Sequence, residues 1–242
     1  MRMWLIGSII VLIAVILVVF SDVRRLAITG YLILQVKPYE RVLPDAPVIL
    51  IAGDSTGYGT GASRGSNTVA GYLGADFPEY AVENMSVNGR TIGGLAAALP
   101  ERTAGTQYRV ILLQIGGNDI IQKKPVATSE ADLRAVLEVA TKRADQVIMM
   151  SSGNVGTAVA FVSDAGEPDP EYDRVTREMR EMFMRVTSEY EVAYVDLFVE
   201  PEVDVYFKEP KRYLAADGLH PSDLGYFDWY QKLKPVLEET LK

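Results

Sequence analysis

Residues 48–55 read VILIAGDS, a short run of apolar side chains that ends in Gly-Asp-Ser. Such a run is typical of a strand that is buried on both faces of a parallel sheet. A serine on the tight turn after the strand projects its hydroxyl out of the sheet, where backbone N–H groups can face a developing oxyanion. Ser55 is therefore a candidate nucleophile, and capping of the next helix is the alternative role for it.

Similar runs follow along the chain, separated by stretches with helical periodicity. The expected strands are Val48–Ala52, Ala81–Met85, Val110–Ile115, Val147–Ser151 and Val192–Val195. Apolar stripes at helical spacing comprise Leu133, Val136, Leu137 and Ala140, then Val175, Met179, Met182, Phe183 and Val186, and finally Phe227, Tyr230, Leu233 and Leu237. Strands that alternate with helices predict right-handed crossovers and a doubly wound α/β sheet.

Ligands of such sheets bind at the carboxyl ends of the strands, so the loops after the strands are candidate sites. The third expected strand is followed by Gly116-Gly117-Asn118-Asp119. The two glycines let the backbone approach a ligand closely, and Asn118 offers a neutral N–H donor that suits an oxyanion. A glycine-rich turn with an Asn cap is the alternative for this stretch.

The only histidine of the chain, His220, follows Asp217-Gly218-Leu219 just before the last expected helix. An aspartate three residues before a histidine can accept from the ring's Nδ1–H and leave Nε2 facing a nucleophile. A histidine satisfied by local hydrogen bonds is the alternative. The conjunction of His220 with Ser55 and Asn118 at one expected edge of the sheet favours nucleophilic catalysis.

Composition excludes several other classes of function. The chain has 242 residues, which fits one domain and a short additional segment. Its 24 basic and 32 acidic side chains give a formal charge of −8, which disfavours duplex nucleic acid as a partner. Because the chain has no cysteine and one histidine, disulfides, cysteine nucleophiles and mechanisms that need two histidines are excluded.

Residues 3–20 read MWLIGSIIVLIAVILVVF, a run without a charge. A helix of this length reaches about 27 Å, just enough for a hydrocarbon core of about 30 Å. No A-x-A pattern closes the run, so a signal anchor that stays uncleaved is favoured over a signal peptide. We expect residues 1–25 to form a single-pass anchor, 26–46 a juxtamembrane segment and linker, and 47–242 the catalytic domain.

The apolar stretch at residues 26–36 is too short to span a membrane, so it lies on the membrane surface or packs on the domain. A chain that begins near Ala46 should then be soluble and active. Arginines flank the apolar run on both sides, and the positive-inside bias therefore leaves its orientation open. We expect an extracytoplasmic catalytic domain.

Four blocks of the sequence, taken in order, resemble those of the SGNH (GDSL-type) hydrolases: Gly53-Asp54-Ser55, Asn88-Gly89, Gly116-Gly117-Asn118-Asp119 and Asp217-Gly218-Leu219-His220. The resemblance covers about residues 47–240. It implies a flavodoxin-like three-layer α/β/α fold and serine esterase chemistry. One departure is Thr56, where the family more often has Leu or Ile.

The resemblance also implies a role for each matching residue. Ser55 would be the nucleophile, His220 the general base and Asp217 the group that orients the base. The oxyanion hole would comprise the backbone N–H groups of Ser55 and Gly89 and the side chain of Asn118. We expect neither a cofactor nor a metal ion.

The resemblance allows lipid esters, lysophospholipids, acyl thioesters and acetylated sugars as substrates. The expected anchor favours a lipid or other acyl ester, with a carbohydrate O-acetylesterase as the alternative. Apolar residues after the fourth expected strand could line an acyl pocket or simply pack under their own loop: Val155, Val159, Phe161 and Val162.

Three functions of other classes compete with this interpretation. Residues 57–62 have the dinucleotide-binding pattern G-x-G-x-x-A, but Asp76 and Glu83 are misplaced for the acid that this pattern requires. A metal-dependent phosphoesterase could use Asp54, Asp119, Asp217 and His220, although one histidine among carboxylates is a thin ligand set. The third alternative is a non-catalytic binding domain on a membrane stalk.

Overall fold

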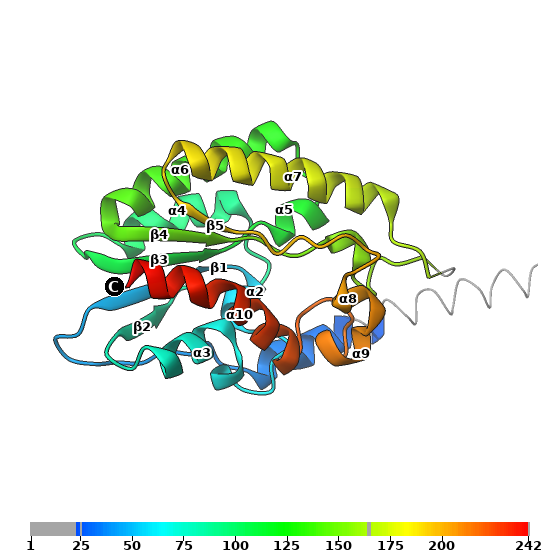
Figure 1. Cartoon of the computed structure of the whole chain (residues 1–242), viewed down its shortest axis with the longest axis horizontal. Helices are drawn as coiled ribbons and strands as arrows, with labels where there is room; N and C mark the ends of the chain where they lie inside the picture. The colour runs from blue at the N-terminus through cyan, green and yellow to red at the C-terminus, as the bar shows by residue number, and fades with distance from the viewer. Residues whose placement is uncertain (1–22, 25, 164–165, 242) are drawn as a thin grey trace, which may run out of the picture.

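The computed structural model describes residues 23–24, 26–163 and 166–241. Its centre is a five-stranded sheet in the order β2-β1-β3-β4-β5, in which all neighbouring strands are parallel (Figure 1). The strands are β1 (Val48–Gly53), β2 (Ala81–Asn84), β3 (Tyr108–Gln114), β4 (Ala144–Met150) and β5 (Ala193–Val195). The five expected strands are all present, with ends that differ by a few residues, and their order is that of flavodoxin-like sheets.

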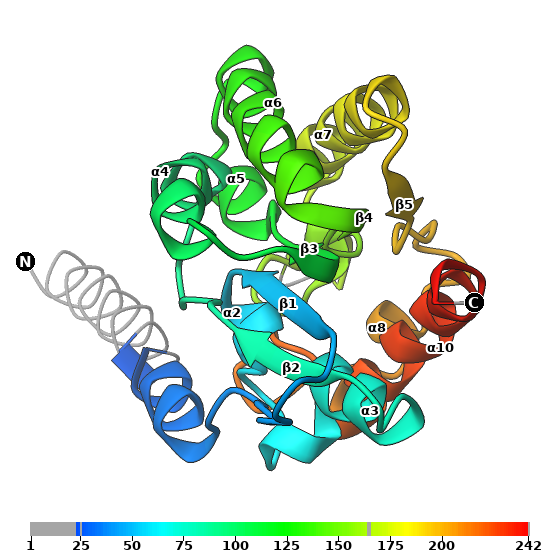
Figure 2. The ribbon, with the colours of Figure 1, turned by 90° about the vertical axis from the view of Figure 1, so that its left-hand side faces the viewer.

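Helices cover both faces of the sheet and complete the predicted three-layer α/β/α sandwich. One face carries α4 (Ile92–Arg102), α6 (Val126–Arg143) and α7 (Pro170–Glu189), and the other carries α3 (Val69–Asp76) and α10 (Asp223–Thr240) (Figure 1, Figure 2). The shorter helices are α2 (Ser55–Tyr58), α5 (Gly117–Ile121), α8 (Val205–Lys208) and α9 (Pro210–Tyr213), with 3-10 turns at Gly65–Asn67 and Val155–Thr157.

Successive residues of each strand point to opposite faces, and both faces are apolar. In β1, Ile49 and Ile51 join the core beneath α3 and α10. Leu50 and Ala52 join the core beneath α4, α6 and α7. All four side chains are fully buried. Burial on both faces explains why the strands are unbroken apolar runs in the sequence.

The predicted apolar stripes of α6 and α7 are buried, but the stripe of α10 differs at one position. Its buried side chains include Tyr226 and Trp229. Phe227 is instead 43 % exposed, and its ring packs edge-on against Tyr72. A 3.6-residue period cannot separate two adjacent aromatic residues at the margin of a stripe, so only the packed structure shows which one faces the sheet.

Residues 26–35 are helical and pack on the domain through Leu32, with Val36 buried just after the helix. The outer side of this helix is apolar and exposed, most strongly at Leu34. Among the described residues, no helix is both long enough and apolar enough to span a membrane. The anchor expected at residues 3–20 lies outside the described residues.

The chain then runs along the edge of the sheet before it enters β1. Arg41 forms an antiparallel bridge with Val82 of β2. Its guanidinium donates to the backbone carbonyls of Phe77 and Tyr80, which follow α3. These bonds fasten residues 37–46, the expected linker, to the domain.

Candidate active site

Ser55 is the first residue of α2, directly beyond the carboxyl end of β1. Asp54 caps this helix, because one of its carboxylate oxygens accepts from the Thr56 N–H at 2.9 Å and from the Thr56 hydroxyl at 2.8 Å. The capping role that was the alternative for Ser55 therefore belongs to Asp54. The serine hydroxyl is left for a different partner.

That partner is His220. The Ser55 Oγ lies 2.8 Å from His220 Nε2, and His220 Nδ1 lies 2.6 Å from Asp217 Oδ2. The other carboxylate oxygen of Asp217 accepts from the backbone N–H groups of Leu219 and His220, each at 3.1 Å. A hydroxyl is thus placed next to a base whose second nitrogen is held by a carboxylate.

Asp217 is buried together with His220. Burial by itself raises the pKa of a carboxyl group, but the hydrogen bond from His220, its charge and the two backbone amides outweigh burial here. The pKa of Asp217 therefore lies below its usual value. An ionised Asp217 keeps the proton of the ring on Nδ1, so that Nε2 can accept from Ser55.

The loop that carries His220 lies against the glycine-rich segment after α2. Gly61 has a φ of +98°, and a Cβ there would lie 2.9 Å from the His220 Cβ and 2.5 Å from the Pro221 carbonyl oxygen. A larger residue at position 61 would push His220 away from Ser55. Close packing within the protein therefore explains this glycine of the dinucleotide-like pattern.

Asp54 is a second buried carboxyl group beside Ser55. Burial raises its pKa from the ordinary 3.8 to about 6, against the lowering effect of the bonds from Thr56 and the charge of His220. The neutral form of Asp54 therefore predominates in the folded protein below about pH 6. The sequence drew attention to Asp54 only as part of the motif and as a rival metal ligand.

Asn118 lies in α5, after a glycine with a left-handed backbone, Gly116. Its side-chain amide donates to the Arg90 carbonyl oxygen at 3.0 Å, which joins it to the turn after β2. An Asn amide carries two N–H bonds, and the bond to Arg90 fixes the plane in which the second one lies. The next residue, Asp119, is fully buried and accepts from the Ile92 N–H at the start of α4, at 2.9 Å.

Gly89 lies on the exposed turn between β2 and α4 with a φ of +76°, and no atom lies within 4 Å of where its Cβ would be. The cavity next to Ser55 is also lined by Asn118 and His220, and Gly89 does not contribute to that lining. The structure thus brings three of the predicted site residues to one cavity, places Asp217 behind His220 and leaves Gly89 on a neighbouring turn.

The cavity has a volume of about 80 Å³, and its walls are mostly apolar. The apolar lining residues are Ile121, Val155, Ala158, Leu197, Leu214, Leu219 and Trp229. Of the residues considered for an acyl pocket, Val155 lines the cavity, Val159 is 46 % exposed and Phe161 packs on the Tyr172 ring. Sequence reasoning missed Leu197, Leu214 and Trp229, because a cavity residue has the same apolar pattern as a core residue.

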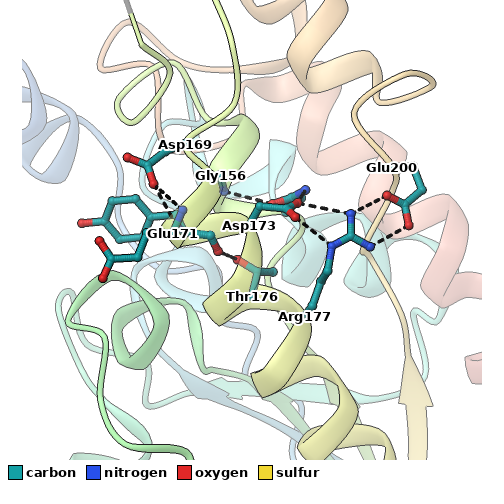
Figure 3. Close-up of polar contacts among 9 residues, drawn as sticks. Gly156, Asp169, Glu171, Asp173, Thr176, Arg177 and Glu200 are labelled. Atoms are coloured by element: carbon teal, nitrogen blue, oxygen red, sulfur yellow. Dashed lines mark hydrogen bonds and ion pairs between the residues drawn. The ribbon is translucent and has the colours of Figure 1, made fainter.

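The cavity wall that carries Val155 is fastened to α7. Asn154 donates to Asp173 at 2.8 Å and accepts from the Gly156 N–H at 3.0 Å. Arg177 then joins Asp173 to Glu200 (Figure 3). This network holds the loop after β4 in place, so the apolar cavity is preformed.

Within the described part of the chain, no group of three or more His, Asp or Glu side chains is placed to hold a metal ion. The acids considered as ligands serve other partners. Asp119 supports α4, whereas Asp54 caps α2. The geometry favours the hydroxyl, imidazole and carboxylate chemistry described above.

Residues 51–226 match the GDSL-like Lipase/Acylhydrolase family. This match covers most of the chain and includes Ser55, Asn118, Asp217 and His220. The chain therefore belongs to this family of lipases and acylhydrolases, and it is a carboxylic ester hydrolase. The resemblance seen in the sequence is confirmed.

Two curated relatives share most of their length with the chain. It is 23 % identical to Esterase TesA of Pseudomonas aeruginosa over 222 residues, which cover 90 % of this chain and 100 % of the relative. It is 26 % identical to Thioesterase 1/protease 1/lysophospholipase L1 of Escherichia coli over 197 residues, which cover 79 % of this chain and 86 % of the relative.

A solved structure confirms the fold. A member of the lipolytic G-D-S-L family from Veillonella parvula superposes with a TM-score of 0.64 at 19 % identity, covering 80 % of this chain and 99 % of the other. At this identity the likeness speaks for the fold alone.

Proposed function

We propose that this protein hydrolyses carboxylic acyl esters with Ser55 as nucleophile, His220 as general base and Asp217 as the group that orients His220. The observation that carries the proposal is the chain of hydrogen bonds from Ser55 through His220 to Asp217 at the mouth of an apolar cavity. A hydroxyl with a pKa far above neutrality needs such a base to become a nucleophile.

In the first half of the reaction, Ser55 Oγ attacks the ester carbonyl carbon while His220 Nε2 takes its proton. The carbonyl oxygen becomes an oxyanion, and the proposed donors to it are the Ser55 N–H, the Gly89 N–H and the second N–H of Asn118. Collapse of the intermediate breaks the bond to the leaving oxygen, which receives the proton from His220. An acyl group on Ser55 and a released alcohol remain.

In the second half, His220 takes a proton from water, and the hydroxide attacks the acyl carbon. Collapse returns the proton to Ser55 and releases the carboxylic acid. Protonation of His220 by the medium removes the acceptor in both halves, so activity falls as the pH is lowered.

The proposed substrate is an acyl ester of a lipid or lysophospholipid, or the corresponding thioester. The apolar walls around Val155, Leu197 and Trp229 support an acyl group in the cavity. The names of the two relatives, an esterase and a thioesterase/lysophospholipase, fit the same class. A series of p-nitrophenyl esters from acetyl to decanoyl tests this: a maximum above acetyl is expected, and a strict preference for acetyl would favour a carbohydrate O-acetylesterase.

We further propose that residues 1–25 anchor the protein in a membrane and present the domain at residues 47–242 on the extracytoplasmic side. The uncharged run at residues 3–20 supports the anchor. Carbonate extraction of membranes should leave the full chain in the pellet. A soluble chain that begins after about residue 20 would instead reveal a cleaved signal.

The nucleophile is tested by Ser55→Ala, with Ser152→Ala as a matched control from the wall of the same cavity. Loss of the nucleophile should lower kcat by at least about 10⁴-fold without changing the circular dichroism spectrum. Labelling by a fluorophosphonate should disappear in Ser55→Ala and persist in Ser152→Ala. Near-normal turnover by a folded Ser55→Ala would overturn the serine mechanism.

A further inference from the structure

The helical segment at residues 26–35 lies outside residues 51–226, which match the family, yet it contacts the loop that carries His220. Figure 1 shows this blue segment next to α9. Ile28 and Arg24 line one side of an open groove whose other side is formed by Leu214 and Lys211. The segment therefore covers the back of the site, on the far side of Asp217 from Ser55.

One polar contact crosses this junction. The Thr29 hydroxyl donates to Asp217 Oδ2 at 3.2 Å. The same oxygen accepts from His220 Nδ1 at 2.6 Å, and the Asp217 side chain is fully shielded from solvent. A hydroxyl from a residue 188 positions away thus shares the oxygen that holds the general base.

The donors to Asp217 come from two sources. Oδ1 accepts from the backbone amides of Leu219 and His220, which belong to the same loop. Oδ2 accepts from the His220 ring and from Thr29. Among the described residues, Thr29 is the donor to this ring-facing oxygen that comes from outside the loop. Since a buried carboxylate keeps its charge and orientation through its hydrogen bonds, the loss of one donor changes both.

The segment that delivers Thr29 is held to the domain by buried residues and hydrogen bonds that follow Thr29 in the chain. Leu32 is 7 % exposed and Val36 is 2 % exposed. Farther along, the bonds from Arg41 to Phe77 and Tyr80 fix the chain to the α3 side of the sheet. The position of the Thr29 hydroxyl is therefore set by packing.

We propose that Thr29 is a positioning residue, which orients the Asp217 carboxylate and moderates its charge toward His220. This inference rests on the function proposed above, with Ser55, His220 and Asp217 in their stated roles. The helical segment at residues 26–35 precedes the family match at residues 51–226, and through Thr29 it contributes to the active site. Thr29 does not line the substrate cavity, so its effect is on the chemical step rather than on binding.

The test is Thr29→Val, which removes the hydroxyl at nearly constant volume, compared with Thr29→Ser, which keeps it. Thr141→Val is the matched control, because its hydroxyl donates to the Leu137 carbonyl oxygen within α6. We expect Thr29→Val to lower kcat about 5- to 20-fold with an unchanged KM, because it removes a hydrogen bond to a charged group. Thr29→Ser should restore most of the rate, and Thr141→Val should match the unmodified protein.

Two further readouts separate positioning from simple stabilisation. Without the Thr29 donor the carboxylate is a stronger partner for the protonated ring, so the acidic limb of kcat/KM should move to higher pH. The described ionisable groups near this junction include Arg24 and Lys211 in the groove, Tyr226, which interacts electrostatically with Asp217, and Asp54, which interacts electrostatically with His220. All of them are retained in Thr29→Val.

The second readout is the proton resonance of the ring Nδ1–H, which has a single source because His220 is the only histidine. It should shift in Thr29→Val and keep its position in Thr141→Val. An unchanged resonance, pH profile and kcat in folded Thr29→Val would overturn the inference while leaving the serine mechanism intact. If the unmodified protein hydrolyses no ester, the proposed function is overturned instead. The ring resonance would then be the test of the hydrogen bond between Thr29 and Asp217.

Discussion

Two parts of the chain meet at Asp217, and they are built in different ways. The carboxyl edge of the sheet holds Ser55 and His220 on short loops between fully buried strands and helices. The segment at residues 26–46 is held mainly by Leu32, Val36 and the bonds from Arg41. The core therefore determines where Ser55 and His220 lie, whereas a peripheral segment supplies a hydrogen bond to the Asp217 carboxylate behind them.

After the loss of Ser55 itself, the largest effect within the sheet edge is expected for Asp217→Asn. An amide cannot hold the His220 ring with its proton on Nδ1, so kcat should fall about 10⁴-fold while the fold is preserved. Steady-state kinetics on a p-nitrophenyl ester measure this loss. Asp145→Asn, the same change on an exposed side chain, serves as the control. If Asp217→Asn keeps a tenth of the rate, a different group orients the base.

Next in size is Asn118→Ala, which removes the proposed side-chain donor to the oxyanion. It should lower kcat about 10²- to 10³-fold with a smaller change in KM, because the donor acts mainly in the transition state. Full kinetic curves separate the two constants. A raised KM at constant kcat would assign Asn118 to substrate binding instead.

A smaller effect concerns stability at the same edge. The pKa of Asp54 is raised to about 6, so the fold prefers the neutral form. Above this pH, Asp54 is ionised in both the folded and the unfolded chain. The raised pKa then lowers the free energy of unfolding by about 3 kcal/mol, since each pKa unit corresponds to about 1.4 kcal/mol. Below about pH 4 the group is neutral in both states and the cost disappears.

Asp54→Asn should therefore raise the free energy of unfolding near pH 8 by up to about 3 kcal/mol, and the gain should vanish toward pH 4. The amide oxygen can still accept from Thr56, so the cap of α2 is kept. Urea unfolding at both pH values measures the difference. If Asp54→Asn changes the free energy of unfolding equally at pH 8 and pH 4, ionisation of Asp54 does not destabilise the folded protein.

The peripheral segment is probed by two shortened chains, one beginning at residue 23 and one at residue 47. The first should match the full chain in rate. The second keeps the sheet but loses Thr29 and the Arg41 bonds, so we expect a rate about 5- to 20-fold lower and an unfolding free energy lower by about 1–3 kcal/mol. Equal rates and equal stabilities would show that the two regions are independent.

The features that were predictable from the sequence are those with a local physical cause. Strands buried on both faces must be unbroken apolar runs, so β1 to β5 could be located before the structure. Asp217 and His220 share one loop, and the motif before α2 places Ser55 at the end of β1. Parallel strands bring loops to one edge of the sheet, so the fold class together with the two motifs predicted that Ser55 and His220 meet.

The other features depended on packing between distant parts of the chain. The cavity wall at Leu197 and Trp229 has the apolar pattern of ordinary core, and Phe227 differs from its buried neighbour only by its direction. The bond from Thr29 to Asp217 joins residues 188 positions apart. No periodicity or motif encodes such a contact, because it exists only once the first helical segment has docked. The sequence by itself determined the sheet and its reactive edge, and the tertiary structure decided what surrounds that edge.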